Sequence, residues 1–172
     1  MALVGAVLSG CGSAASSASI APAAGHYPVA SPPPEALTTP TASKGHYQLV
    51  AAGEPVIVHR AGAVAAVDVA GPDINPLPAT QGQPPAQQAP GTLTVTVRPS
   101  SGRLDVAAAN FLGLDQAQNR IALHADRPLV HADPKHPATL RLSAIFFAGH
   151  TTVTWQPAGR PLVTWDFVVE LD

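Results

Sequence analysis

The chain has 172 residues, a formal net charge of −2 at pH 7 and a charged fraction of only 12%. This composition provides no basic field that would attract nucleic acid, so we exclude binding to DNA or RNA. The single cysteine excludes an intramolecular disulfide, and no apolar run reaches the length of about 18 residues that a transmembrane helix requires.

The first distinctive motif is Leu8-Ser9-Gly10-Cys11, which follows a short apolar run over residues 2–8. It resembles the lipobox of bacterial lipoproteins. The resemblance implies a signal peptide over residues 1–10, cleavage before Cys11 and a diacylglyceryl group on the thiol of this cysteine. Two or three acyl chains hold a protein stably at a membrane. The expected location is therefore the extracytoplasmic face of the cell membrane, with the lipid as anchor.

The apolar run departs from a complete signal peptide, because no Lys or Arg precedes residues 2–8, whereas secretory signals begin with a positively charged region. Either the true start lies upstream of Met1, or the tetrapeptide is accidental and Cys11 is an incidental or buried cysteine. The small Gly, Ser and Ala residues at 12–19 favour the first alternative, since such residues typically follow lipoprotein cleavage sites. We therefore expect Cys11 to be acylated.

Residues 11–44 are predicted to be a disordered tether. Between residues 12 and 43 the only Asp, Glu, Lys or Arg is Glu35, and large apolar side chains are rare. Such a segment buries too little apolar surface to offset its ordering entropy, and the prolines at 32–34 favour an extended polyproline conformation. A plain spacer and an O-glycosylated stalk both fit this composition. The folded domain is expected over residues 45–172.

From residue 45 the pattern changes to short segments rich in Val and Ala, separated by turn residues. We predict strands over residues 47–52, 55–59 and 62–70. Residues 71–91 contain six prolines, and proline disrupts both central strands and helix interiors. This segment is therefore predicted to be a long exposed loop.

Residues 92–98 alternate strictly between Thr and apolar residues before ending at Arg98, which is typical of a strand with one buried face. Extended segments are predicted at 103–109 and 110–114. After a turn at 115–119, residues 120–125 are predicted to form a return strand.

The C-terminal third contains three further predicted strands, at residues 139–146, 151–155 and 162–171. In the last of these, Trp165, Phe167, Val169 and Leu171 share one face because side chains alternate along a strand. Trp155 has the same phase as Val153. Both tryptophans are therefore predicted to lie in the core rather than to form a sugar-binding platform.

About eight to ten short strands, with turn signals at a spacing of roughly 8 to 12 residues, predict an antiparallel sandwich or a small barrel. The segments beginning at Leu140, Gly149, Val153 and Trp165 read LRLS, GH, VTWQP and WDFVVE. They resemble the immunoglobulin-like domains of secreted and lipid-anchored actinobacterial proteins of unassigned function. The resemblance covers residues 90–172 and implies an all-β, immunoglobulin-like antiparallel β-sandwich. It includes no catalytic motif.

Reactive side chains gather in one segment, where His124, His131, Asp133 and His136 form a candidate metal site. Neutral imidazole is a ligand for both Zn and Cu, and a carboxylate can complete the set. Three prolines kink residues 124–137, and neither Cys nor Met accompanies the histidines. We therefore prefer a solvated loop to a specific metal site as the interpretation of this segment.

Sequence patterns that would indicate a catalytic site are weaker than the pattern of the candidate metal site. Ser100-Ser101-Gly102 lacks the strand-turn-helix context of a nucleophile elbow. Asp166 and Glu170 share a strand face but lie about 13 Å apart at roughly 3.3 Å per residue, too far to act on one bond. We assign no catalytic residue and no cofactor.

The leading hypothesis is a non-enzymatic, lipid-anchored extracytoplasmic module that binds a protein or a small ligand through residues 71–91 and 124–137. The second is a periplasmic or cell-wall Cu- or Zn-binding protein that uses the histidines of residues 124–136. The third is a hydrolase whose site is assembled only by the fold. A deep pocket with several titratable groups favours the hydrolase, and three converging imidazoles favour the metal protein.

Overall fold

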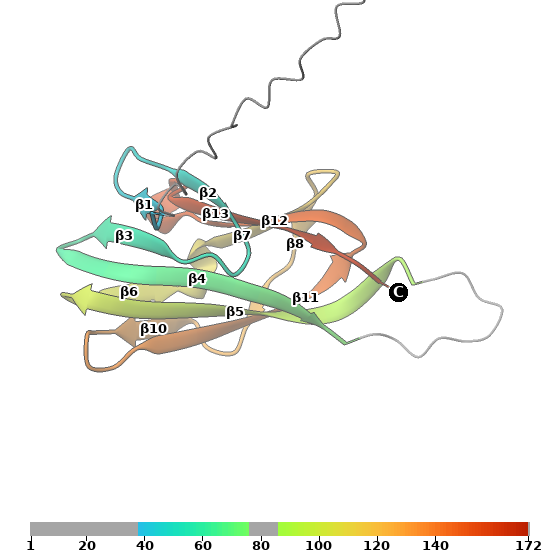
Figure 1. The fold of residues 1–172 in the computed structure, drawn as a ribbon. Helices are drawn as coiled ribbons and strands as arrows, with labels where there is room; N and C mark the ends of the chain where they lie inside the picture. The colour runs from blue at the N-terminus through green and yellow to red at the C-terminus, as the bar shows by residue number, and fades with distance from the viewer. Residues whose placement is uncertain (1–37, 76–85, 172) are drawn as a thin grey trace, which may run out of the picture. The chain divides into compact units, whose positions relative to one another are not determined.

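The structure, a computed structural model, describes residues 38–75 and 86–171, which belong to one compact unit. The predicted signal peptide, Cys11, most of the predicted tether and the centre of the proline-rich segment lie outside these residues. The described part forms thirteen strands and two short 3-10 helices (Figure 1). None of its helices is long and apolar enough to cross a membrane.

Two large sheets account for most of the strands. The six-stranded sheet contains, in spatial order, β1 (Thr41–Ala42), β3 (Val56–Arg60), β4 (Ala63–Ile74), β5 (Gln88–Ser101), β11 (Ala138–Phe147) and β9 (His124–Ala125). The five-stranded sheet contains β2 (Gln48–Ala51), β13 (Val163–Val169), β12 (Gly149–Trp155), β7 (Phe111–Asp115) and β8 (Arg120–Ile121). A two-stranded ribbon of β6 (Leu104–Ala107) and β10 (Leu129–Ala132) lies beside them, and the 3-10 helices are η1 (Ala108–Asn110) and η2 (Pro157–Gly159).

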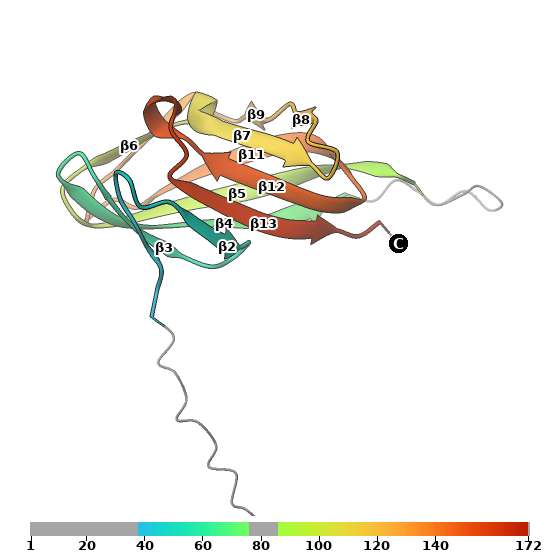
Figure 2. The same cartoon turned by 90° about the horizontal axis from the view of Figure 1, so that it is seen from above.

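The two large sheets pack face to face around one apolar core. In the view from above, β7, β12 and β13 lie over β4, β5 and β11 (Figure 2). In β5 the predicted alternation is confirmed, since Leu93, Val95 and Val97 are fully buried while the intervening threonines are only partly buried. Trp155 and Trp165 are also fully buried, so both predictions of core tryptophans are confirmed. The sequence pattern therefore identified the buried face of these strands correctly.

The order in which the chain visits the sheets is that of an immunoglobulin-like Greek key. After β5 the chain crosses to β7 in the opposite sheet, returns to β11 beside β5, and crosses again to β12 and β13 beside β7. β5 and β11 are thus paired inner strands of one sheet, and β7, β12 and β13 are three adjacent strands of the other. This arrangement defines the immunoglobulin-like fold. The predicted all-β, immunoglobulin-like sandwich is confirmed.

Two N-terminal strands add parallel pairs that local sequence patterns do not show. β1 pairs in parallel with β3 in one sheet, and β2 pairs in parallel with β13 in the other. Ala42, within β1, is fully buried. The chain therefore joins the fold before residue 45 and contributes to both sheets within a few residues.

The prediction of an exposed loop over residues 71–91 is wrong at both ends, where β4 continues to Ile74 and β5 begins at Gln88. Pro72 lies at a register shift between Ala70 and Asp73, where no ladder hydrogen bond requires its missing N–H. Pro90 lies next to the end of the β4–β5 ladder at Ile74. Pro72 is accommodated because it lies where the β4–β5 ladder is interrupted, and Pro90 because it lies where that ladder ends.

The prediction of a solvated loop over residues 124–137 also needs correction. Leu129–Ala132 form β10, which pairs with β6, and Val130 and Ala132 are buried. The predicted single strand at 120–125 is divided, because β8 pairs with β7 in one sheet and β9 pairs with β11 in the other. This segment therefore crosses the side of the sandwich.

Candidate functional site

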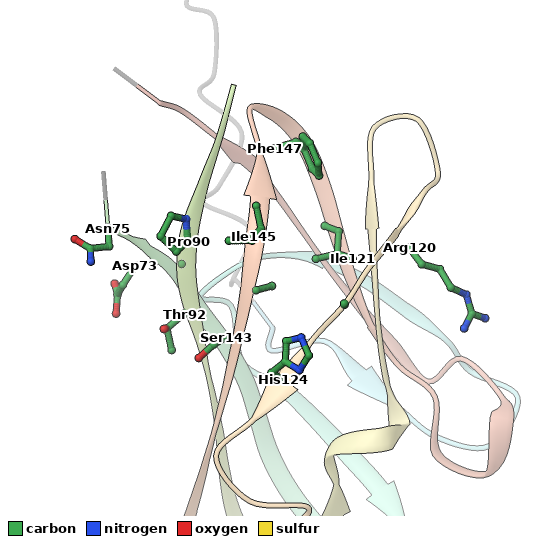
Figure 3. A pocket seen from close by; sticks show the side chains of 13 residues that line it. Asp73, Asn75, Pro90, Thr92, Arg120, Ile121, His124, Ser143, Ile145 and Phe147 are labelled. Atoms are coloured by element: carbon green, nitrogen blue, oxygen red, sulfur yellow. The ribbon is translucent and has the colours of Figure 1, made fainter. Parts of the chain in front are cut away.

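An open groove of about 550 Å³ lies over the last residues of β4, the first residues of β5 and the end of β11 (Figure 3). The segment from β8 to β9 forms its other wall. The residues lining it are Asp73, Asn75, Pro90, Gly91, Thr92, Arg120, Ile121, Ala122, His124, Ser143, Ala144, Ile145 and Phe147. The groove, which we call the edge groove, thus joins parts of both segments predicted to form the binding surface.

On one side of β11, backbone pairing stops at Ser143. β9 pairs with Leu142 and Ser143 only, whereas β5 pairs with β11 as far as Phe147. Among residues 38–75 and 86–171, no strand continues the sheet beside Ala144–Phe147. The end of β11 is therefore a free sheet edge within the edge groove.

The hydrogen bonds identify which peptide groups of β11 face this free edge. Ile145 lies opposite Pro90, whose carbonyl accepts a hydrogen bond of 2.9 Å from the Asn75 N–H on the far side of β5. In an antiparallel pair, opposite residues either bond to each other or both face away. The N–H and C=O of Ile145 therefore face away from β5.

Phe147 has the same orientation as Ile145. The N–H of Ala148 donates a 3.0 Å hydrogen bond to the carbonyl of Gln87, so Ala148 faces β5 and its neighbour Phe147 faces away. On the opposite side of β11, Arg141 accepts a 3.1 Å hydrogen bond from the N–H of Asp126. The period of two residues thus places the peptide groups of Arg141, Ile145 and Phe147 on the same side.

The side chains at the free edge are apolar and accessible. Ile145 is 49% exposed and Phe147 is 45% exposed, while the intervening Phe146 is fully buried in the core. Large apolar side chains on a free edge make strand addition favourable, because both the backbone and the side chains have unsatisfied contacts. At every second residue of this edge, an extended chain can therefore form main-chain hydrogen bonds and pack against an exposed apolar side chain.

A polar row crosses the sheet next to these apolar side chains. Asp73, Thr92, Ser143 and His124 are successive cross-strand neighbours on β4, β5, β11 and β9. They lie across the lower part of the view in Figure 3. Side chains directly opposite one another stand on the same face of a sheet, so this row forms a polar strip along the groove.

The polar strip does not form a catalytic triad. Asp73 lies on β4, two strands away from Ser143, and no hydrogen bond joins Ser143 to His124 in the described part of the chain. A serine becomes nucleophilic through a hydrogen bond to a base that a third group orients. The polar strip thus lacks the hydrogen-bonded pair of nucleophile and base that a triad requires.

The residues of the predicted metal site lie apart. Nδ1 of His131 is 2.7 Å from Oδ1 of Asp105, and Nδ1 of His136 is 3.1 Å from Oδ2 of Asp133, while His124 lies in the edge groove. Among the residues that the structure describes, no group of three or more His, Cys, Asp or Glu side chains is placed to hold a metal ion. Within the described residues, His131 and His136 are thus each paired with one carboxylate, and no set of three metal ligands is formed.

These carboxylates show the electrostatic effect of their partners. Side-chain hydrogen bonds from His131 first and Arg103 second lower the pKa of Asp105, and the hydrogen bond from His136 lowers the pKa of Asp133. Within a turn, Asn119 lowers the pKa of Asp115. All three carboxylates are at or near the surface. They stabilise turns and strand pairs and form no common site.

Sequence reasoning missed Ile145 and Phe147 as functional candidates. The predicted strand over residues 139–146 contains Ile145 and ends one residue before Phe147. The only available signal was the unbroken apolar run from Ala144 to Phe147, since a strand with one solvent-facing side normally carries polar residues at alternate positions.

No protein-family model matches the chain, and no curated protein is similar to it in sequence. Two solved structures resemble it. The secreted protein MPT63 of Mycobacterium tuberculosis aligns over 77% of this chain and 100% of its own, at 12% identity and a TM-score of 0.45. An uncharacterized β-sandwich protein of Clostridium difficile aligns over 80% of this chain and 99% of its own, at 7% identity and a TM-score of 0.40.

Proposed function

We propose that this protein is a non-enzymatic binding module, anchored by lipid on the extracytoplasmic face of the cell membrane, that captures an extended polypeptide segment in the edge groove. The observation that carries this proposal is the free edge of β11, with the peptide groups of Ile145 and Phe147 turned away from β5. An added strand pairs with such groups through main-chain hydrogen bonds, which supply affinity independently of sequence.

Side chains along the groove supply the selectivity. Ile145 and Phe147 are two residues apart and stand on one face, so they favour a ligand with apolar residues at alternate positions. Asp73 and His124, at the two ends of the polar strip, favour a polar or basic residue next to them. The expected ligand is a short extended segment with this alternating pattern.

The test uses the full chain with Cys11→Ser, which prevents acylation, and a display library of short random peptides as the probe. Ile145→Pro removes the N–H that faces the free edge together with the Ile side chain, and it leaves the ladder with β5 intact because proline is tolerated at outward-facing edge positions. Ile145→Thr is the matched control, since it keeps the N–H and changes only the side chain. Circular dichroism verifies that both variants fold.

Peptides selected on the parent chain are expected to bind Ile145→Pro at least about tenfold more weakly, a loss of roughly 1.4 kcal/mol. They are expected to bind Ile145→Thr with an intermediate affinity. Equal binding to Ile145→Pro and to the parent chain would contradict strand addition. A concentration-dependent dimer that Ile145→Pro abolishes would instead assign this edge to a second copy of the chain.

The lipid anchor rests on the lipobox-like motif and on Cys11 as the single cysteine. Expression of the natural gene in its host with an alkyne-tagged fatty acid tests it directly. The wild type is expected to incorporate the tag and to sediment with membranes, and Cys11→Ser is expected to do neither. Absence of label in the wild type would refute the anchor without affecting the test of the edge groove.

A further inference from the structure

A second concavity, of about 690 Å³, lies at another part of the sandwich, where three turns meet. The turn after β1 contributes residues 43–45, the end of β3 with the turn that follows contributes residues 59–61, and η2 with the following segment contributes the rest. The residues lining it are Ser43, Lys44, Gly45, His59, Arg60, Ala61, Pro157, Ala158, Arg160, Pro161 and Leu162. We call it the basic pocket.

The basic pocket concentrates positive charge on a chain whose net charge is −2. Each of the three segments supplies one cation, namely Lys44, Arg60 and Arg160, and none of the lining residues that the structure describes is an Asp or Glu. The ion pairs in the described part of the chain involve other arginines and histidines. Within the described residues, the three cations therefore border one concavity and form no ion pair with a carboxylate.

Short, hydrogen-bonded turns fix the backbone at these three residues. Lys44 lies in a turn closed by two hydrogen bonds between Ser43 and His46, of 3.1 and 2.9 Å. Arg60 is the last residue of β3 and pairs with Ala63 across a tight turn. Arg160 follows η2, in which the N–H of Gly159 donates a 3.0 Å hydrogen bond to the carbonyl of Gln156. A ligand therefore binds without a large cost of ordering the backbone.

We propose that the basic pocket binds a phosphate-bearing molecule. A guanidinium group matches two phosphate oxygens at once and an ammonium group adds a point charge, so two arginines and a lysine form a set typical of phosphate recognition. Pro157, Pro161 and Leu162 give the pocket an apolar wall. The volume exceeds that of a phosphate group and accommodates the less polar remainder of the molecule.

The phosphate can belong to a soluble compound or to the headgroup of a phospholipid, and both present the same oxyanion to the pocket. The pocket is bounded by the turn that follows β1, which is the first strand of the described chain. A separate probe for each source distinguishes them. Neither probe depends on the edge groove, so failure here leaves the proposed function untouched.

The experiment uses the full chain with Cys11→Ser and two probes. Inorganic pyrophosphate is titrated into the isotope-labelled protein and followed by NMR, and vesicles of phosphatidylglycerol are compared with vesicles of phosphatidylcholine by co-sedimentation. Lys44→Glu and Arg160→Glu change exposed pocket cations. Arg141→Glu, on the outer face of β11, is the control with the same change of charge.

Lys44→Glu and Arg160→Glu are each expected to weaken binding at least about tenfold, whereas Arg141→Glu changes it by less than about twofold. Binding of pyrophosphate alone assigns the pocket to a soluble phosphate compound, and binding of phosphatidylglycerol vesicles alone assigns it to a headgroup. Equal losses in all three variants, or binding of neither probe, would overturn the proposal. Thermal melts of each variant verify that the fold is retained.

Discussion

Nδ1 of His131 lies 2.7 Å from Oδ1 of Asp105, directly across the β6–β10 ribbon. Nε of Arg103 lies 3.1 Å from the same oxygen. His131 is the larger cause of the lowered pKa of Asp105, whose ordinary value is 3.8. His131→Ala is therefore expected to raise the pKa of Asp105 toward this value, and Arg103→Ala is expected to raise it less, as measured by carboxyl ¹³C NMR.

The sign of the accompanying stability effect follows from the lowered pKa of Asp105. A carboxyl group with a depressed pKa in the folded state stabilises the fold above its unfolded pKa, and this contribution disappears as the pH falls through the folded pKa. Any loss of folding stability caused by His131→Ala is therefore expected at neutral pH and not in strong acid. Both side chains are about half exposed, at 51% and 52%, so the loss is small. A larger pKa rise in Arg103→Ala would contradict this assignment.

Trp155 and Trp165 are both fully buried but differ in their hydrogen bonding. The indole N–H of Trp165 donates a 3.1 Å hydrogen bond to the carbonyl of Glu54, whereas Nε1 of Trp155 has no hydrogen-bond partner in the described part of the chain. Trp165→Phe is expected to lower the free energy of unfolding by about 1 to 2 kcal/mol more than Trp155→Phe. Urea denaturation of the two variants measures the difference, and the reverse order would contradict the assignment.

Thr154 and Thr164 lie opposite each other on β12 and β13, and their buried hydroxyl oxygens are 2.6 Å apart. Replacing either residue by Val leaves the other hydroxyl without its partner and is expected to cost about 1 to 3 kcal/mol of stability. The double variant removes both polar groups and is expected to be no less stable than either single variant. Additive losses in this double-mutant cycle would show that the two hydroxyls do not depend on each other.

Titration of the full chain carrying Cys11→Ser with Zn²⁺ or Cu²⁺ tests the predicted metal residues. His131 and His136 each face a carboxylate, and His124 lies in the edge groove, so no three-ligand set is assembled in the described residues. We expect dissociation constants weaker than about 10 µM. Tighter binding that is lost in His124→Ala would establish the metal site that the sequence predicts.

Strand alternation and turn chemistry could be read from the sequence because both are local. The Thr and Val alternation of β5 and the turn around Asp115 depend on residues close to each other along the chain, and both are present as predicted. Pairing partners are not encoded locally. The parallel pair of β2 and β13 joins segments more than one hundred residues apart, and no periodicity within either segment indicates it.

The two candidate sites depend on this distant pairing. The free edge near Ile145 exists because the segment from β8 to β9 changes sheets after Ile121, which a continuous strand prediction could not anticipate. The basic pocket joins Lys44, Arg60 and Arg160, each isolated in its own turn of the sequence. A single cation in a turn indicates only solvent exposure, so the cluster is visible only in the fold.

The parallel pairing of β2 with the last strand has a mechanical consequence. A force applied between the start of β2 and the end of β13 pulls these strands along their length in opposite directions, because the two pulled ends of a parallel pair lie at opposite ends of the pair. The Gln48–Leu162 and Ala52–Asp166 hydrogen bonds, of 3.1 and 2.9 Å, are then loaded together. Rupture in this shearing geometry requires the bonds to break at once rather than one after another, so the pair of β2 and β13 resists a lengthwise pull more strongly than a pair whose bonds open in sequence.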